Sequence, residues 1–241
     1  MQGPKRKMGA ASINSMRITA IVPAAGRGTR LGATVPKQFI ELEGRPVLVH
    51  CLGVLDNVEL ISAIIVSASQ SETEIIRKMI KDFCIKKVTD VVEGGKERTQ
   101  SVRNAFNRIS SADYVLIHDA VRPFITESAV VDVIHAGISY GAAISAVPVT
   151  DTVKFADKDN IIVKNIERNG LWLAQTPQVF SYDLLSEAYR MYDRNPVEAT
   201  DESGIMELQG TKVKIVQGSI FNIKITTESD LILAKLIAGI R

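Results

Sequence analysis

The residues that decide the fold read ITAIVPAAGRGTRLG at positions 18–32, and Pro36, Lys37 and Gln38 follow shortly after them. The β-branched run at residues 18–22 predicts a buried strand. The segment after it is a glycine-rich turn that carries several cationic side chains. Glycines let backbone N–H groups approach an anion closely, and the cations neutralise its charge. The stretch therefore predicts a strand that ends in a polyphosphate-binding loop.

Two better-known phosphate loops do not fit this turn. A P-loop requires a Gly-Lys-Ser/Thr ending that is absent, and a dinucleotide fingerprint requires a third glycine where this chain has Leu31. The fingerprint also needs an acidic residue about 20 positions on, where the second strand instead ends VSAS at residues 66–69. Pro36 fixes the backbone ahead of Lys37, and lysine suits a phosphate as a compact point charge. The alternative reading is a plain strand–helix connection.

Charge and composition exclude several classes of protein. The chain has 241 residues and a formal net charge of +2, but the first sixteen residues hold Lys5, Arg6 and Lys7 and no acid. Without these three positive charges the remainder carries −1, which argues against a protein that coats nucleic acid. No apolar run approaches the ~20 residues of a membrane span. Residues 1–16 are expected to be a disordered extension.

Cysteine and histidine usage bears on the compartment and on metals. Cys51 and Cys84 are too few for a disulfide framework or a thiolate metal site, so a reducing cytoplasm fits. We expect a bacterial cytoplasm, and the acid-free residues 1–16 leave a plastid open. The histidines His50, His118 and His135 lack the spacing of metal ligands. We therefore expect no structural metal.

Apolar runs alternate with helical patterns along the chain. Strands are expected at residues 18–22, 63–67, 88–92, 114–118, 143–147 and 213–216. Helices are expected near residues 46–55, 73–83, 99–109, 128–140 and 182–192. The alternation predicts an α/β fold, one domain over residues 17–241, with a mostly parallel sheet and helices on both faces. Such sheets bind ligands beyond the carboxyl ends of their strands. The sequence TESD at residues 227–230 predicts a capping box that opens a last helix.

One stretch breaks the alternation. Residues 152–156 and 161–166 flank the turn sequence DKDN and predict a hairpin arm over about 151–170 that projects from the sheet. An isolated hairpin is marginally stable in water, so we expect it to pack on a neighbouring subunit. Packing back onto its own domain is the alternative.

A second loop, EGGKERTQSV at residues 93–102, follows the third predicted strand. The backbone groups of Gly94 and Gly95 could contact a base edge, and Ser101 could add a hydroxyl. An ordinary strand–helix loop is the alternative. The loop thus extends the predicted nucleotide site by a possible base-reading element.

Asp119 and Lys224 are the charged residues whose predicted surroundings are most apolar. Asp119 follows a buried strand, where an acid commonly holds a ribose hydroxyl or Mg²⁺; pairing with Arg122 is the structural alternative. Lys224 stands in an apolar, strand-like segment, where an ammonium group needs a nearby anion.

Together these motifs resemble those of the 2-C-methyl-D-erythritol 4-phosphate cytidylyltransferases, nucleotidyltransferases of the non-mevalonate isoprenoid route. The resemblance spans residues 17–241. The matching motifs are PAAGxGxR at 23–30, PKQ at 36–38, GGxERxxSV at 94–102, HDAxRP at 118–123, DT at 151–152, RNGLW at 168–172, TPQ at 176–178, TDE at 200–202 and NIK at 222–224. The resemblance implies a Rossmann-like nucleotidyltransferase fold with a β-hairpin dimerisation arm, a homodimer, CTP and a polyol phosphate as substrates, and Mg²⁺ bound mainly through the CTP phosphates.

The resemblance also implies roles for the matched residues. Arg30 and Lys37 would hold the triphosphate and stabilise the reacting α-phosphorus, Lys224 would bridge the two phosphates, and Arg168 would reach the polyol phosphate across a dimer. The implied nucleotide contacts are Pro23, Ala24, Ala25, Gly26, Gly28, Gly94, Gly95, Ser101, Asp119 and Ala120. The implied substrate contacts are Arg122, Thr152, Thr176 and Thr200. No residue of the chain is expected to ligate the metal directly.

Three other functions remain open at this point. Ribitol-5-phosphate cytidylyltransferases share the glycine-rich loop, PKQ and HDAxRP, although RNGLW and TDE resemble the methylerythritol enzymes more closely. A nucleotidyltransferase that uses UTP or GTP is a more distant alternative. A non-catalytic nucleotide-binding module is the third, and the cations at residues 30, 37 and 224 argue against it.

Overall fold

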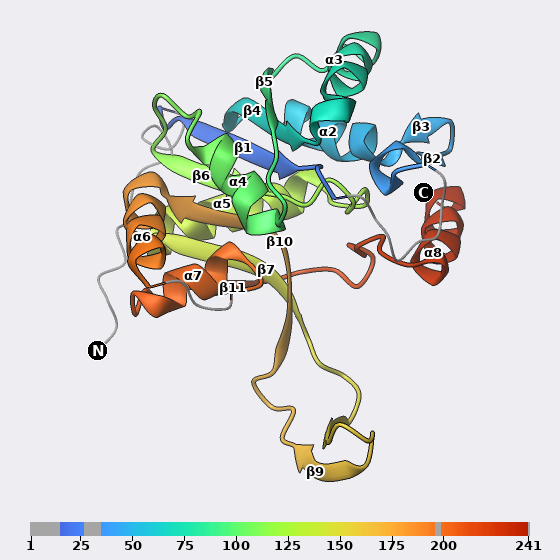
Figure 1. Cartoon of the computed structure of the whole chain (residues 1–241), viewed down its shortest axis with the longest axis vertical. Helices are drawn as coiled ribbons and strands as arrows, with labels where there is room; N and C mark the ends of the chain where they lie inside the picture. The colour runs from blue at the N-terminus through green and yellow to red at the C-terminus, as the bar shows by residue number, and fades with distance from the viewer. Residues whose placement is uncertain (1–14, 27–34, 196–198, 241) are drawn as a thin grey trace.

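The computed structural model describes residues 15–26, 35–195 and 199–240, and its centre is a seven-stranded sheet (Figure 1). The strands follow the order β11–β7–β10–β6–β1–β4–β5. Their bounds are β1 Ile18–Pro23, β4 Ile61–Ala68, β5 Val88–Glu93, β6 Tyr114–Ile117, β7 Ala142–Pro148, β10 Trp172–Ser181 and β11 Lys214–Gln217. All neighbouring pairs are parallel except the two that β10 forms with β6 and β7. The prediction of a mostly parallel α/β sheet is confirmed.

Helices cover both faces of this sheet, as predicted. They are α2 Val47–Asn57, α3 Thr73–Asp82, α4 Arg98–Phe106, α5 Glu127–Tyr140, α6 Tyr182–Arg194 and α7 Glu202–Leu208, whereas α8 Glu228–Gly239 lies to one side of the sheet (Figure 1). Short 3-10 turns lie at Lys37–Phe39 and Gln70–Glu72, and a small hairpin pairs β2 Glu41–Leu42 with β3 Arg45–Pro46. The predicted capping box is confirmed at the start of α8.

The two-residue period of the strands divides the core into two layers. Ala20 and Val22 belong to the cluster packed by α2, α3 and α5, whereas Ile21 between them joins the cluster packed by α4, α6 and α7. Leu116 and Ile117 divide in the same way. Alternate side chains of a strand point to opposite faces, so each strand contributes to both cores. The rigid centre fixes where the strand ends lie.

The sequence analysis missed β10, a central antiparallel strand, and also the short helix α7. Pro177 lies within β10, and proline inside a run normally argues against a central strand because it cannot donate to the ladder. The structure accommodates it where the pairing with β7 shifts register between Ala174 and Gln178, and the Thr176–Pro177 peptide bond is cis. The irregularity places Thr176 beside the end of β6.

The predicted hairpin is confirmed as a projection from the sheet (Figure 1). Its strands are β8 Val153–Ala156 and β9 Ile162–Ile166, and the Asp157 carboxylate accepts backbone hydrogen bonds that close the turn. Its apolar side chains Phe155, Ile161, Ile162 and Val163 are largely exposed, and so are Trp172 and Leu173 at the start of β10 beside it. Among the described residues, no helix is long and apolar enough to cross a membrane.

Candidate active site

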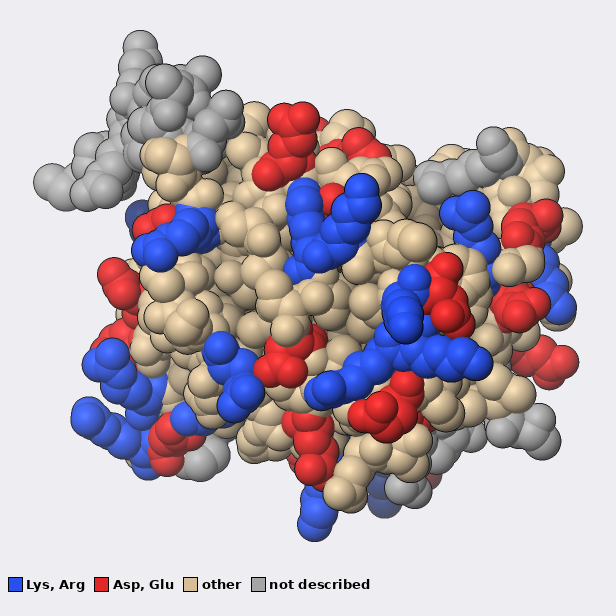
Figure 2. All heavy atoms as spheres, turned by 90° about the horizontal axis from the view of Figure 1, so that it is seen from above, with Lys and Arg blue, Asp and Glu red and all other residues tan. Residues whose placement is uncertain are grey.

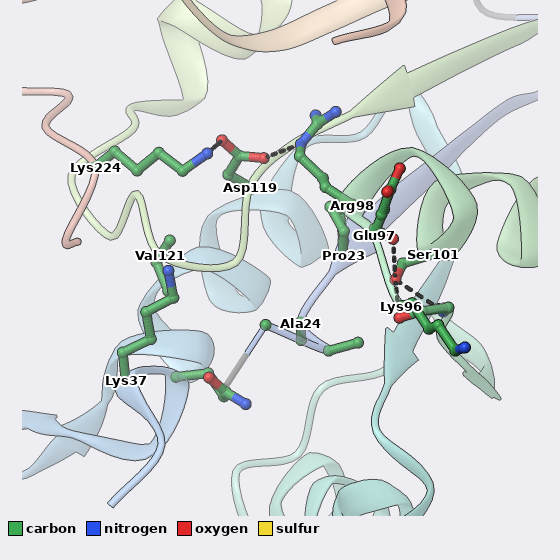
Figure 3. A pocket seen from close by; sticks show the side chains of 14 residues that line it. Pro23, Ala24, Lys37, Lys96, Glu97, Arg98, Ser101, Asp119, Val121 and Lys224 are labelled. Carbon is green, nitrogen blue, oxygen red and sulfur yellow. Dashed lines mark hydrogen bonds and ion pairs between the residues drawn. The ribbon is translucent and has the colours of Figure 1, made fainter. Parts of the chain in front are cut away.

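A cavity lies beyond the carboxyl ends of β1, β5 and β6, where a parallel sheet is expected to bind its ligand (Figure 3). It is lined by Pro23, Ala24, Ala25, Gly26, Lys37, Gln38, Gly95, Lys96, Glu97, Arg98, Ser101, Asp119, Val121 and Lys224. Four of these side chains are cationic and two are acidic. Segments far apart in the chain therefore meet at one polar, mainly positive site.

The positive character of the cavity is local. Figure 2 shows Lys and Arg side chains interspersed with Asp and Glu over the described part of the face seen from above. The cavity, by contrast, is lined by four cations, Lys37, Lys96, Arg98 and Lys224, against two acids. This distribution suits a nucleotide phosphate better than an extended polyanion.

The two glycine loops pack against each other at the floor of the cavity. The Ala24 N–H donates to the Ser67 carbonyl at 2.7 Å, and the Gly94 N–H donates to the Ala68 carbonyl at 2.7 Å. A Cβ added at Gly94 would lie 2.5 Å from the Ala25 Cβ, which leaves no room for another side chain. These contacts bring the start of α4 against the end of β1.

Ser101 already has partners within this floor. Its Oγ accepts the Gly95 N–H at 3.0 Å and lies 3.0 Å from the Glu97 carbonyl, to which it donates. The side chain is buried but borders the cavity. Ser101 therefore fixes the loop of Gly94 and Gly95.

Asp119 is the centre of a buried charge network. Arg98 Nε lies 2.8 Å from Asp119 Oδ1, and Lys224 Nζ lies 2.8 Å from Asp119 Oδ2. Figure 3 shows the two cations approaching the carboxylate from opposite sides. Arg122 Nε is a more distant third cation, 3.6 Å from Oδ2. The sequence left pairing of Asp119 with Arg122 as an alternative to a ligand contact, but Arg98 and Lys224 lie closer to the Asp119 carboxylate.

The ionisation of Asp119 follows from these contacts. Burial by itself raises the pKa of the Asp119 carboxyl, but Arg98, Lys224 and Arg122 together hold that pKa well below its usual range. Asp119 is therefore a carboxylate at neutral pH. Because both oxygens face cations, it acts as an anchor for positive side chains.

A hydrogen-bond chain fixes the backbone at this point. Thr176 Oγ1 accepts the Asp119 N–H at 3.0 Å and lies 3.1 Å from His118 Nδ1, and His118 Nε2 lies 3.2 Å from the Arg122 carbonyl. A carbonyl only accepts, so Nε2 carries the proton and Nδ1 accepts from the threonine hydroxyl. Burial lowers the pKa of His118 to about 4, so the ring is neutral and every hydrogen bond in the chain is made.

The segment that carries Lys224 is held by buried polar groups. Arg122 Nη1 donates to the Asn222 carbonyl at 2.7 Å, and Asn222 Nδ2 donates to the Thr176 carbonyl at 2.8 Å. The Ile225 N–H donates to the Val121 carbonyl at 2.9 Å. Lys224 lies in a loop, so the expectation of a strand-like segment is wrong. Its ammonium does have the expected nearby anion, because it contacts Asp119.

The structure unites some of the predicted site residues and separates others. Those that line the cavity are Pro23, Ala24, Ala25, Gly26, Lys37, Gly95, Ser101, Asp119 and Lys224. Gly94, Ala120, Arg122 and Thr176 lie behind it, the last three buried. Thr152, Arg168 and Thr200 are exposed and do not line it; Arg168 donates to the Thr150 carbonyl. Gly28 and Arg30 lie outside the described residues.

Arg98 and Glu202 are charged residues whose role the sequence analysis missed. Arg98 Nη1 lies 2.7 Å from Glu202 Oε2, and Glu202 is fully buried. Both belong to quoted motifs, GGxER and TDE, but nothing in their spacing indicates that the two motifs meet. The pairing of this arginine with this glutamate can be recognised only once the fold brings the two residues together.

The described residues contain no group of three or more His, Cys, Asp and Glu side chains that could hold a metal ion. Glu97 and Asp119 are the acids that line the cavity, and Asp119 already has a cation at each oxygen. The donor set therefore fits a divalent cation only where phosphate oxygens of a ligand supply most of its ligands.

Comparisons with known proteins agree with this architecture. The family model for 2-C-methyl-D-erythritol 4-phosphate cytidylyltransferase (IspD) matches residues 18–239. Proteins of that name from Bacillus mycoides and Syntrophus aciditrophicus are 39% and 42% identical over 90% and 91% of this chain, covering 96% and 94% of their own lengths.

Solved structures give the same result. The 4-diphosphocytidyl-2C-methyl-D-erythritol synthase of Anaerococcus prevotii superposes with a TM-score of 0.81 at 31% identity, over 93% of this chain and 99% of the other. The cytidylyltransferase of Thermus thermophilus superposes with a TM-score of 0.77 at 29% identity, over 93% and 100%. The predicted family is confirmed: the chain belongs to the 2-C-methyl-D-erythritol 4-phosphate cytidylyltransferase family.

Proposed function

We propose that the chain transfers a cytidylyl group from CTP to 2-C-methyl-D-erythritol 4-phosphate, giving 4-diphosphocytidyl-2-C-methyl-D-erythritol and pyrophosphate. Membership of the family supports the substrates. The observation that carries the proposal is the convergence of Lys37 and Lys224, from opposite ends of the chain, on one cavity beyond the strand ends.

The proposed reaction needs no general base. The nucleophile is a phosphate monoester, whose second pKa near ~6 leaves it mostly dianionic at neutral pH. One of its oxygens forms a bond to the α-phosphorus of CTP, and the bond from that phosphorus to the bridging oxygen of the β-phosphate breaks. The obstacle is the approach of one anion to another, so catalysis consists of positioning and charge neutralisation.

Each cation takes a part in this scheme. Lys37 and Arg30 hold the triphosphate and stabilise the charge that develops at the α-phosphorus, and Lys224 bridges the α-phosphate and the incoming phosphate. Asp119 sets the position of Lys224 through their contact at 2.8 Å. The ribose lies by Asp119, and the cytosine lies against the loop of Gly95 and Ser101.

Mg²⁺ enters this scheme with the nucleotide. When bound, it would neutralise phosphate charge as a hard cation that prefers oxygen ligands. The residues described above hold the nucleotide rather than the ion, in keeping with the occupied oxygens of Asp119.

The arm supplies the rest of the substrate site in a homodimer. Arg168 and Thr152, at its base, lie outside the cavity of their own chain, and we place them at the polyol phosphate of the partner. The exposed side chains of Phe155 and Ile162 support burial of the arm against another subunit. Thr200 and Thr176 assist substrate binding, Thr176 through the backbone it fixes. We place the enzyme in the cytoplasm, where CTP is available and where free Cys51 and Cys84 stay reduced.

Release of pyrophosphate from CTP and 2-C-methyl-D-erythritol 4-phosphate tests the proposal. We expect turnover with this substrate and far less with ribitol 5-phosphate, and with UTP or GTP in place of CTP. Faster turnover with ribitol 5-phosphate would assign the chain to that activity instead. Tight CTP binding without pyrophosphate release from either polyol would indicate a binding module.

A further inference from the structure

A chain of four charged side chains runs from the buried side of α7 to the edge of the cavity. Glu202 contacts Arg98, Arg98 contacts Asp119, and Asp119 contacts Lys224, at 2.7, 2.8 and 2.8 Å. The two ends differ most in exposure: the Glu202 side chain is 0% exposed and the Lys224 side chain 36%, with Arg98 at 23% and Asp119 at 6% between them. One end is therefore fixed in the protein interior and the other meets the ligand.

The guanidinium of Arg98 is divided between two carboxylates. Its Nε donates to Asp119 and its Nη1 to Glu202, while Nη2 is buried without a hydrogen-bond partner among the described residues. Arginine and a carboxylate prefer a bidentate pair with two parallel hydrogen bonds. Arg98 does not form such a pair with Asp119: its Nη2, the donor beside Nε, is left without a partner among the described residues, and Asp119 Oδ2 contacts Lys224 instead.

The division leaves Asp119 Oδ2 to Lys224. If Glu202 no longer held Nη1, Arg98 would turn toward Asp119 and take both of its oxygens. Lys224 would then lose its anchor, and the ammonium on its flexible stem would no longer be held at one position. Groups that stabilise a reacting phosphate must be held closely in place, since a displacement of about 1 Å can cost on the order of 10²-fold in rate.

We propose that Glu202 is a positioning residue, which acts through Arg98 and Asp119 to hold the Lys224 ammonium toward the reacting phosphates. Glu202 itself touches no substrate, because it lies fully buried behind Arg98. The catalytic consequence rests on the proposed cytidylyl transfer; the control of Lys224 by Glu202 does not.

The kinetic test is Glu202→Gln, which removes the charge with little change of shape. We expect kcat to fall by about 10- to 100-fold, while CTP binding measured by calorimetry stays within about threefold. Glu207→Gln, on the exposed side of the same helix, is the matched control and should keep wild-type kinetics. Assays well below the unfolding midpoint of each variant separate lost positioning from lost stability.

The coupling between Glu202 and Lys224 distinguishes positioning from a merely structural role. In a Lys224→Ala background the Glu202→Gln substitution should lower kcat by less than about twofold, because residues that act as one unit are not additive. An equal loss in both backgrounds would overturn the proposal. If Glu202→Gln does not fold, Glu202→Asp, which keeps the charge but shortens the side chain, serves in its place.

A second readout needs no turnover. Reductive ¹³C-methylation makes Lys224 visible by NMR, and Lys224→Arg assigns its signal by loss. We expect this signal to shift in Glu202→Gln and to stay unchanged in Glu207→Gln. An unchanged signal in Glu202→Gln contradicts the inference. A wild-type protein that releases no pyrophosphate contradicts the proposed function instead, and the NMR comparison then decides the inference alone.

Discussion

The cavity and the projecting arm differ in which side chains they bury and which they expose. In the cavity, charged groups are buried and paired: Asp119 is 5% exposed and has Arg98 and Lys224 at its oxygens. In the arm, apolar groups are exposed, with Phe155 at 53% and Ile162 at 61%. Among the described residues, the charged groups of the cavity have partners, whereas the apolar side chains of the arm stay exposed. Under the proposed function, the nucleotide half of the site is assembled within one chain and the arm contacts a second subunit.

The largest expected effect concerns the stability of the cavity. Asp119→Ala removes the anion that Arg98 and Lys224 share, and breaking a buried pair in this way costs about 3–5 kcal/mol. Denaturant unfolding of wild type and variant measures the loss. Asp157→Ala, an exposed carboxylate that only closes the turn of the arm, should cost about 1 kcal/mol or less. Equal costs at the two sites would remove the contrast.

The next effect concerns turnover. In the proposed mechanism, Lys37→Ala and Arg30→Ala each remove a cation that stabilises transition-state charge, and we expect kcat to fall by on the order of 10²–10³. Pyrophosphate release measures the loss, and thermal unfolding checks that both variants fold. Lys81→Ala, an exposed lysine of α3, is the matched control. Near-normal turnover in Lys37→Ala or Arg30→Ala would refute the role given to that residue.

The dependence of the free energy of unfolding on pH tests the buried groups of the cavity separately. Burial lowers the pKa of His118 to about 4 in the folded chain, whereas the ordinary histidine pKa is ~6.5. Between these two pH values the unfolded chain binds a proton at His118 and the folded chain does not. The free energy of unfolding should therefore fall as pH drops through this window, by at most about 3 kcal/mol. Carboxylates contribute as well, so the comparison is with His118→Gln, which should show a shallower fall.

His135 supplies the control for this titration. It is an exposed histidine of α5 that does not line the cavity, so His135→Gln makes the same substitution away from the site. Identical curves for wild type and His118→Gln would show that His118 is not the group responsible.

The smallest effect concerns the arm. Arg168→Ala should raise the KM for the polyol phosphate by about tenfold, roughly 1.4 kcal/mol, and leave the affinity for CTP unchanged. Steady-state kinetics with calorimetry of CTP binding separates the two. A parallel loss of CTP affinity would place Arg168 in the nucleotide half of the site and remove the division between cavity and arm.

The oligomeric state tests the same division. Deletion of residues 152–166 should convert a dimer to a monomer in light scattering while CTP still binds. If the intact protein is already monomeric, the role given to the arm is wrong.

The sequence predicted the elements whose signals are local. The run at residues 18–22, the turn DKDN and the capping box of α8 depend on neighbouring residues, and all three are confirmed. β10 was not predicted because Pro177 within it argues against a central strand. Its antiparallel direction also depends on β6 and β7, which lie on either side of it.

The candidate site was predictable to the extent that its motifs end strands of one sheet. Asp119, which follows β6, and Ala24, which follows β1, line one cavity for that reason. The link of Arg98 to Glu202 was not predictable, because two charges distant in sequence show their pairing only when burial brings them together. The same holds for Thr176, whose hydroxyl is engaged by Asp119 and His118.

A crystal structure with CTP and Mg²⁺ tests the central claim most directly. The account predicts that Lys37 and Lys224 both contact the triphosphate of one nucleotide in the cavity, with the α-phosphorus between them. A nucleotide that reaches one ammonium and leaves the other in solvent would contradict it.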